Sequence, residues 1–139
     1  MRPALSRALL DTPIKEVTRR MSERHTNAVP VLDPDGQVVG EITCEALFQY
    51  GLPDFFLQLR SVSFIADFDP FEKYFESEGG MKAGDIMSPD FAALPPQASL
   101  LEIVFALTVL RHPKVYVVES GKLLGTIDQS QVLDRIINI

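Results

Sequence analysis

The sequence predicts a mixed α/β (α+β) fold made of two copies of one β-α-β-β-α unit. Aligning Val29 with Val115 sets an offset of 86 residues, under which two predicted helices place apolar residues at the same positions. Each copy continues with two β-branched runs joined by a glycine-containing turn, which is typical of a β-hairpin. Because 46% of the 139 residues are hydrophobic, the two copies can bury a core against each other.

Each element of the first copy has its own signal. Its helix is expected to begin at Thr12-Pro13, because threonine is a favoured N-cap residue and proline is favoured at the first helical position. Gly36 can take the positive φ of the hairpin turn without a Cβ clash. A second helix follows the hairpin, and the Thr43 hydroxyl can cap it.

The second copy repeats these signals with different residues. Ser99 can cap its first helix, and Ser120-Gly121 forms its hairpin turn. The helix "LLEIVFALTVL" is apolar nearly all the way round, whereas its counterpart "IKEVTRRMSER" has one apolar stripe and a charged face. One face of the apolar helix can bury against its own copy, and the remainder needs another cover. We therefore expect a homodimer in which this helix packs across the interface.

The segment between the copies is rich in aromatic residues. The expected division of the chain is a first repeat at 1–52, a connecting segment at 53–80 and a second repeat at 81–139. Nine of the twelve aromatic residues lie in or beside the connecting segment, which is unlike a disordered linker. Asp69-Pro70 is expected to open a short helix that Gly79-Gly80 ends. The rings either pack as a satellite core or form a flap that contacts a ligand or partner.

The two copies also differ at their starts. Met1 aligns with Met87, so the first copy has no counterparts of the "AGDI" stretch that precedes Met87. Either the chain was cut from a longer one or started at an internal methionine, or its first copy is naturally incomplete.

Composition and charge argue against a nucleic-acid-binding, a disulfide-bonded or a membrane-spanning protein. The 13 basic and 19 acidic residues give a net charge of −6, the wrong sign for binding nucleic-acid phosphates. Cys44 is the only cysteine, so no intramolecular disulfide can form, and a cytoplasmic location is the simpler expectation. No apolar run reaches the roughly 18 residues that span a bilayer, and the first residues lack a signal-peptide pattern. We therefore expect a soluble protein without membrane insertion.

Three stretches together resemble a known family. They are "AGDIMSPDFAALPPQASLLEIVFALTVL", "VPVLDPDGQVVGEIT" and "VYVVESGKLLGTID", and they resemble the tandem cystathionine-β-synthase (CBS) domain pair, or Bateman module. The resemblance implies two repeats packed about a pseudo-twofold axis, a disc-like dimer of such modules, and clefts between repeats that bind adenosine-containing nucleotides in many members. It also implies a regulatory role beside a transporter, channel or enzyme.

One motif of that family bears directly on ligand binding. Nucleotide-binding members follow the hairpin with glycine, two residues, Ser or Thr, two residues and Asp, so that a hydroxyl meets phosphate or ribose and a carboxylate accepts both ribose hydroxyls. The first repeat has Thr43 at the hydroxyl position but Ala46 at the acid position. The second has Asp128 and Gln131 at these positions. Gln131 can bond one ribose hydroxyl, whereas Asp128 would repel a nearby phosphate.

Two basic residues precede the second hairpin, where the family often has one. Lys114 is the main candidate for a phosphate contact, and Arg111 is the second. The leading hypothesis is a module that senses AMP, ADP, ATP or S-adenosylmethionine in the cleft near Thr43 and Lys114, with no required cofactor. The alternative is a nucleotide-free dimerisation or protein-interaction module.

The sequence contains no pattern that indicates catalysis. It has no "GxxxxGK[ST]" phosphate loop. His25 and His112 are the only histidines, and neither has a cysteine or second histidine at metal-ligand spacing. Cys44 has no histidine or basic neighbour in sequence to activate it. We therefore expect neither an enzyme nor a metal site.

Overall fold

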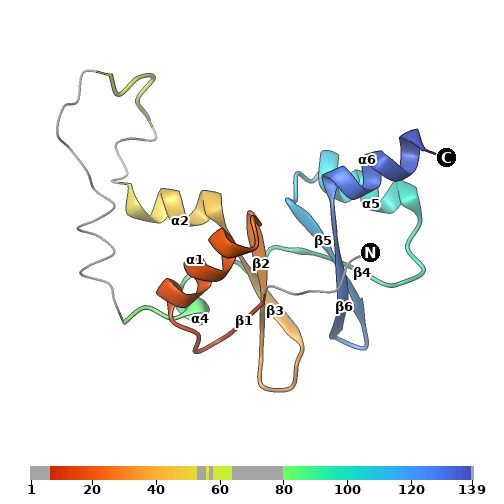
Figure 1. Ribbon diagram of the computed structural model, residues 1–139, viewed down its shortest axis with the longest axis horizontal. Coiled ribbons are helices and arrows are strands. Elements are labelled where there is room, and N and C mark those ends of the chain that lie inside the picture. Colours follow the sequence, from red (N-terminus) through yellow and green to blue (C-terminus); the bar gives the residue numbers. More distant parts are fainter. Residues whose placement is uncertain (1–6, 53–55, 57, 64–79, 139) are drawn as a thin grey trace.

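The computed structural model describes residues 7–52, 56, 58–63 and 80–138, and these form two similar units of sheet and helix (Figure 1). Repeat one contains β1 (Ala8–Leu9), α1 (Ile14–Glu23), β2 (Ala28–Leu32), β3 (Val38–Thr43) and α2 (Cys44–Gly51). The second unit follows α4 (Ala83–Ile86) and contains β4 (Ala92–Leu94), α5 (Leu100–Thr108), β5 (Lys114–Glu119), β6 (Lys122–Asp128) and α6 (Gln129–Ile137). The expected mixed fold of two β-α-β-β-α repeats is therefore confirmed.

The two sheets have the same topology and the same irregularities. Their strand orders are β1-β2-β3 and β4-β5-β6, with the first pair parallel and the second antiparallel in each. Each antiparallel pair shifts register at one point, after Val31 in one sheet and after Val117 in the other. These residues are 86 positions apart, so the structure confirms the alignment of the two copies.

Local signals place most of the element ends. Gly36 and Gly121 both have a φ of 82°, as the hairpin turns require. Ser99 caps α5, because its hydroxyl accepts a hydrogen bond from the Glu102 N–H at 3.1 Å. The expected start of α1 is wrong by one residue, since Pro13 takes the N-cap position with extended backbone. The Thr12 hydroxyl instead accepts from the Leu9 N–H at 2.9 Å.

The short helix α4 packs on repeat one although it leads into repeat two. Figure 1 shows it beside α1 and β1. The Ala83 N–H donates to the Thr12 carbonyl at 2.8 Å, and the Gly84 N–H donates to the Leu10 carbonyl at 2.9 Å. Ala83 is completely buried within the core of repeat one. The chain therefore crosses from one unit to the other between α4 and β4.

Several expectations lie outside the described residues. These are the helix from Asp69-Pro70 to Gly79-Gly80, and the rings of Phe64, Phe68, Phe71 and Phe75, so the satellite core and the flap both stay predictions. Of the remaining aromatic residues near that segment, Phe48 and Tyr50 on α2 are both exposed.

Candidate functional site

A buried hydrogen bond joins the two repeats at their interface. The Tyr116 hydroxyl, on β5, donates to Glu41 Oε2, on β3, at 2.5 Å. Tyr116 is fully buried and Glu41 is 3% exposed. The Tyr116 ring also meets the Phe91 ring edge to face, with centroids 6.3 Å apart. A carboxylate and a phenol from different repeats therefore form the polar centre of the interface.

Burial raises the pKa of both members of this pair, while neighbouring groups shift the pKa of Glu41 in both directions. Burial raises the pKa of Glu41, and Asp90 raises it further, while the Tyr116 hydrogen bond and the charges of His112 and Lys114 lower it. Burial and the nearby Glu41 carboxylate raise the pKa of Tyr116, which keeps the phenol neutral and able to donate. Burial therefore disfavours the ionised form of Glu41. The groups that favour the ionised form, which are Tyr116, His112 and Lys114, all belong to repeat two.

Sequence reasoning missed Glu41. The available signal was a single acid in the apolar strand "VVGEIT", which pairs with Pro30 of the equally apolar β2. The backbone at Glu41 is also engaged, because its N–H and C=O exchange two hydrogen bonds of 2.9 Å with Ser88. Ser88 belongs to the chain that crosses between the repeats, so Glu41 contacts the second unit through both backbone and side chain.

Thr43 occupies the end of β3 and the start of α2. Its hydroxyl oxygen accepts from the Ala46 N–H at 3.0 Å and caps the helix. A hydroxyl can donate its hydrogen while its oxygen accepts, so this cap leaves a donor for a ligand oxygen. The Thr43 site expected from the motif is therefore compatible with the cap.

Asp128 and Gln131 form a capping box at the start of α6. Asp128 Oδ1 accepts from the Gln131 N–H at 3.0 Å, and Gln131 Oε1 accepts from the Asp128 N–H at 2.9 Å. The Ser130 hydroxyl donates to the same Asp128 oxygen at 2.8 Å. The amide oxygen of Gln131 has two lone pairs, so it can accept one further hydrogen bond from a ribose hydroxyl while it stays in this box.

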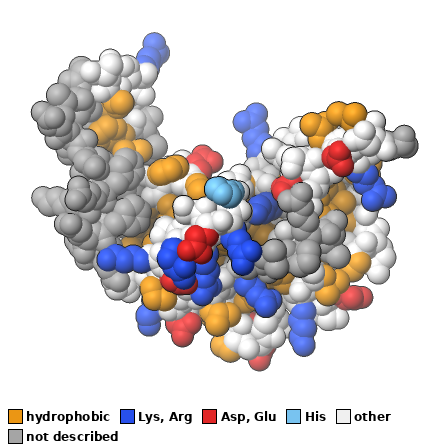
Figure 2. All heavy atoms as spheres, in the orientation of Figure 1, with side chains coloured by type: hydrophobic (Ala, Val, Ile, Leu, Met, Phe, Trp, Pro, Cys, Tyr) orange, Lys and Arg blue, Asp and Glu red, His pale blue; other side chains and the backbone are white. Residues whose placement is uncertain are grey.

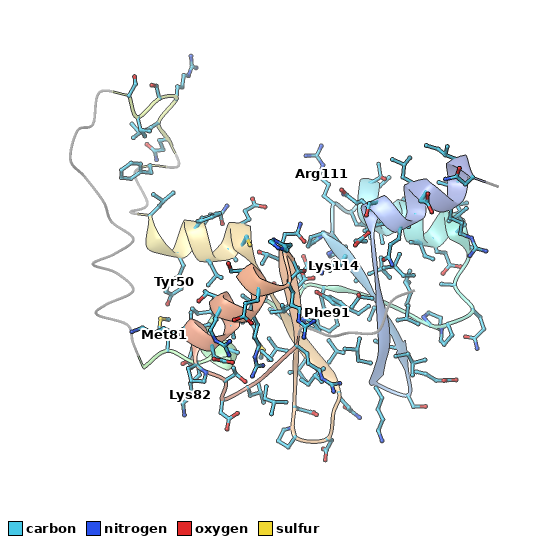
Figure 3. All side chains as sticks on the ribbon, viewed as in Figure 1. Tyr50, Met81, Lys82, Phe91, Arg111 and Lys114 are labelled. Carbon is cyan, nitrogen blue, oxygen red and sulfur yellow. The ribbon has the colours of Figure 1, made fainter. Side chains whose placement is uncertain are left out.

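The structure brings Lys114 to repeat one but not Arg111. The Lys114 ammonium donates to the Thr26 hydroxyl, just before β2, and Figure 3 shows it between the strands of the two repeats. Lys114 also pairs with Asp128 across β5 and β6. Arg111 has a φ of 59° and is exposed, and it points outward beyond the strand ends (Figure 3).

The described residues hold no group of three metal-ligating side chains close enough to bind an ion. No helix among the described residues is both long and apolar enough to span a bilayer.

Comparisons with known proteins agree with this architecture. The family model of the CBS domain matches residues 1–52 and 83–138. The structure of CBSX2 in complex with AMP superposes with a TM-score of 0.74 at 20% identity, covering 99% of this chain and 92% of that one. The CBS domain of a CBS-domain-containing membrane protein from Sphaerobacter thermophilus gives a TM-score of 0.70 at 21% identity, covering 96% and 82%.

A further solved structure is the putative acetoin utilization protein AcuB from Vibrio cholerae, with a TM-score of 0.74 at 17% identity, covering 99% of this chain and 87% of that one. At these identities the likeness shows the fold. The sequence matches no curated protein significantly.

Proposed function

Since the chain belongs to the CBS-domain family, we propose that this regulatory pair of repeats is non-catalytic and binds an adenosine nucleotide between the repeats. Lys114 would contact the phosphate, and Thr43 would donate its hydroxyl hydrogen to phosphate or ribose. The candidate ligands are AMP, ADP, ATP and S-adenosylmethionine. The complex of CBSX2 with AMP supports this proposal, because that protein has the same fold over 99% of this chain.

The main support for this proposal is the position of the Lys114 side chain between the two repeats. Its ammonium crosses from repeat two to the Thr26 hydroxyl of repeat one, and it lies near enough to lower the pKa of the buried Glu41 carboxylate. Rotation about the flexible lysine stem would move the ammonium from Thr26 to a phosphate while the backbone stays in place. A ligand held this way would contact both repeats and so respond to their relative position.

The ribose has a poorer site than the phosphate. Ala46 offers no carboxylate, and the Gln131 oxygen is engaged in the capping box. Glu45 lies one position early on α2 and accepts from the Gln49 side chain at 3.4 Å. We therefore expect weak affinity for adenosine nucleotides.

Calorimetric titration and thermal shift with the four ligands test the proposal. A ligand that binds the native protein raises its melting temperature by mass action. Lys114→Met should weaken phosphate-dependent binding by about tenfold, because charge-assisted hydrogen bonds contribute about 1.5–3 kcal/mol. Lys15→Met, on exposed α1, is the matched control and should bind as the wild type does. Equal binding by the wild type and Lys114→Met would refute the phosphate role.

Ala46→Asp tests the ribose position separately. The new carboxylate should tighten binding by about tenfold or more, because it can accept both ribose hydroxyls. A dideoxy analogue should gain nothing from the substitution. Tight wild-type binding that Ala46→Asp leaves unchanged would place the ribose elsewhere.

The second candidate function is homodimerisation without a nucleotide, and the helical surfaces favour it. Repeat one has a groove of about 310 Å³ between α1 and α2, and repeat two has one of about 260 Å³ between α5 and α6. Six lining residues of each groove correspond under the internal alignment: Thr18 with Val104, Met21 with Leu107, Ser22 with Thr108, Cys44 with Gln129, Leu47 with Val132, and Phe48 with Leu133. The helices of both repeats therefore present matching grooves at the surface.

Equivalent outer positions of α1 and α5 differ in chemistry. On α1, Arg19 forms ion pairs with Glu16 and Glu23 at the surface. On α5, the counterpart of Lys15 is Leu101, which is 77% exposed, and the counterpart of Arg19 is Phe105, which is 48% exposed. Figure 2 shows hydrophobic side chains at the surface over α5 and α6, whereas charged side chains gather over α1. The apolar outer face of α5 favours contact with a second copy.

Light scattering tests the dimer. The wild type should be dimeric at tens of micromolar, and Leu101→Glu should shift it toward the monomer, because a charge in an apolar interface loses its hydration. Lys15→Glu at the equivalent position of α1 is the control. A wild-type monomer at this concentration would contradict the dimer.

A further inference from the structure

Glu41 is a buried acid that has no ion-pair partner among the described residues. It is 3% exposed, and the side-chain hydrogen bond that it accepts comes from Tyr116 at 2.5 Å. Lys114 and His112 act on it through their charges alone. Taking an ionised carboxylate out of water is costly unless hydrogen bonds and an opposite charge compensate. The protonation state of Glu41 therefore depends on a small number of neighbouring groups.

The residues proposed to bind phosphate share the facing surfaces on which this acid lies. Side chains two residues apart in a strand point to the same side of the sheet. Glu41 therefore shares one side of β3 with Thr43, and Tyr116 shares one side of β5 with Lys114. The hydrogen bond between Tyr116 and Glu41 shows that these two sides meet. Because Thr43 and Lys114 are only partly buried, Glu41 lies on the buried side of the proposed phosphate site.

The charged and titratable groups around Glu41 come from three parts of the chain. They are Tyr116 and Lys114 of β5, His112 just before β5, and Asp90 of the segment that crosses between the repeats. Lys114 and His112 favour the ionised carboxylate, whereas the negative charge of Asp90 disfavours it. The strand β2 places the uncharged Pro30 opposite Glu41. Of these groups, Lys114 is the one that the proposed ligand would engage.

A phosphate at Lys114 would change the charge around Glu41 in one direction. Its negative charge would offset that of the ammonium, so the ionised carboxylate would lose a stabilising neighbour and gain a repulsive one. Both effects raise the pKa of Glu41. The hydrogen bond from Tyr116 can persist, because a protonated carboxyl group still has an oxygen that accepts. Protonation of Glu41 would therefore relieve the repulsion without breaking the contact between the repeats.

We propose that Glu41 couples ligand binding to proton uptake, so that a phosphate-bearing ligand binds more tightly when Glu41 is protonated. This inference rests on the proposed function, because it requires a phosphate at Lys114. Binding takes up a proton only at pH values between the pKa of Glu41 in the free protein and its higher pKa in the complex. Affinity should rise as the pH falls through this range, by about tenfold for each unit between the two pKa values.

Calorimetric titrations with AMP and with ATP measure the proton uptake. Repeating them in buffers of different ionisation enthalpy gives the number of protons taken up per bound nucleotide at each pH. Phosphate groups themselves titrate near about pH 6, so Glu41→Gln is measured alongside to isolate the contribution of Glu41. The wild type should take up more protons than Glu41→Gln, by at most one. Glu119→Gln, at the exposed end of β5, is the matched control and should behave as the wild type does.

Further measurements test the physical cause. At pH values above the range, Glu41→Gln should bind AMP more tightly than the wild type does, because its amide has no charge to repel the phosphate. Tyr116→Phe removes a hydrogen bond that favours the ionised acid, so it should move the range to higher pH. In the ligand-free protein, carbon NMR titration of the Glu41 carboxyl group should give a higher pKa in Lys114→Met than in the wild type.

The outcomes separate this inference from the proposed function. Absence of binding by both nucleotides at every pH would overturn the two together. Binding with equal proton uptake by the wild type and Glu41→Gln would overturn the coupling alone and leave the ligand site in place. A Glu41 pKa that Lys114→Met leaves unchanged would also overturn the coupling, because a phosphate could then not act on the acid through this lysine.

Discussion

Tyr116→Phe is the most informative single change, because it removes one hydroxyl and leaves the buried ring in place. The Phe91 contact involves only the ring, so it should survive. What disappears is the 2.5 Å hydrogen bond to Glu41, which is 3% exposed and cannot gain water as a substitute partner. Hydrogen bonds to charged groups contribute about 1.5–3 kcal/mol, so we expect a loss of this size in the free energy of unfolding near pH 7.

The stability cost of Tyr116→Phe should depend on pH, and the raised pKa of Glu41 sets the sign of that dependence. The pKa of Glu41 in the folded protein is raised above its ordinary value of 4.5, mainly by burial, so the folded state holds the proton more tightly than the unfolded chain. The contribution of Glu41 to stability is therefore full below pH 4.5 and is lost as the pH rises through the folded-state pKa. Tyr116→Phe removes a contact that lowers this pKa, so its cost should be larger at pH 7 than at pH 4.

Urea unfolding at both pH values measures these losses, with an unchanged denaturant slope as the check on two-state behaviour. Glu41→Gln supplies the second half of a double-mutant cycle. The amide oxygen can still accept from Tyr116 but carries no charge, so Tyr116→Phe should cost only about 0.5–1.5 kcal/mol in that background. Glu41→Gln alone should gain stability relative to the wild type above pH 4.5 and none below it. Equal costs of Tyr116→Phe in both backgrounds and at both pH values would refute the charged hydrogen bond.

Other expected outcomes concern affinity, assembly and packing. Calorimetry of Ala46→Asp should show adenosine nucleotides binding about tenfold tighter than to the wild type. Phe105→Glu should shift the dimer toward monomer in light scattering, and unchanged mass would count against the α5 interface. In urea, Val31→Phe should cost about 1–3 kcal/mol by overpacking a closed core. Ser99→Ala should cost about 1 kcal/mol through the lost cap of α5.

The fold could be predicted because the sequence contains two copies of the same pattern of helix, strand and turn signals. Several weak local signals had a partner 85 or 86 residues away. The structure shows Gly36 and Gly121 in the same turn role, and Thr43 and Asp128 in the same capping role. His25 and Arg111 are one such pair, since both take positive φ just after the first helix of their repeat. The N-cap of α1 was misplaced because Thr12 is equally suited to a local bond with the Leu9 N–H, which sequence spacing cannot distinguish.

The site was harder to predict, because its central contact joins residues 75 positions apart in the chain. A single acid in a strand usually faces solvent, so the sequence does not distinguish Glu41 from a surface residue, and only its contact with Tyr116 does. Asp128 and Gln131 were predicted from a ligand motif, yet the same residue types three positions apart also make a capping box. Sequence alone cannot choose between these roles, because both need an acceptor at the start of α6.

The internal symmetry also explains why two similar repeats differ in their burial. Backbone topology is shared, but the core of repeat one is completed by α4, which the chain supplies only on its way to repeat two. Repeat two receives no such turn from the described residues, and four of its aligned core residues are only partly buried: Leu94, Leu100, Ile103 and Ile127. The alignment pairs Met1 with Met87, but only the folded structure shows that α4, which precedes Met87, packs in the core of the opposite repeat. Because Tyr116 lies on β5 of repeat two and donates to Glu41 of repeat one, the packing of repeat two bears directly on the interface between the repeats.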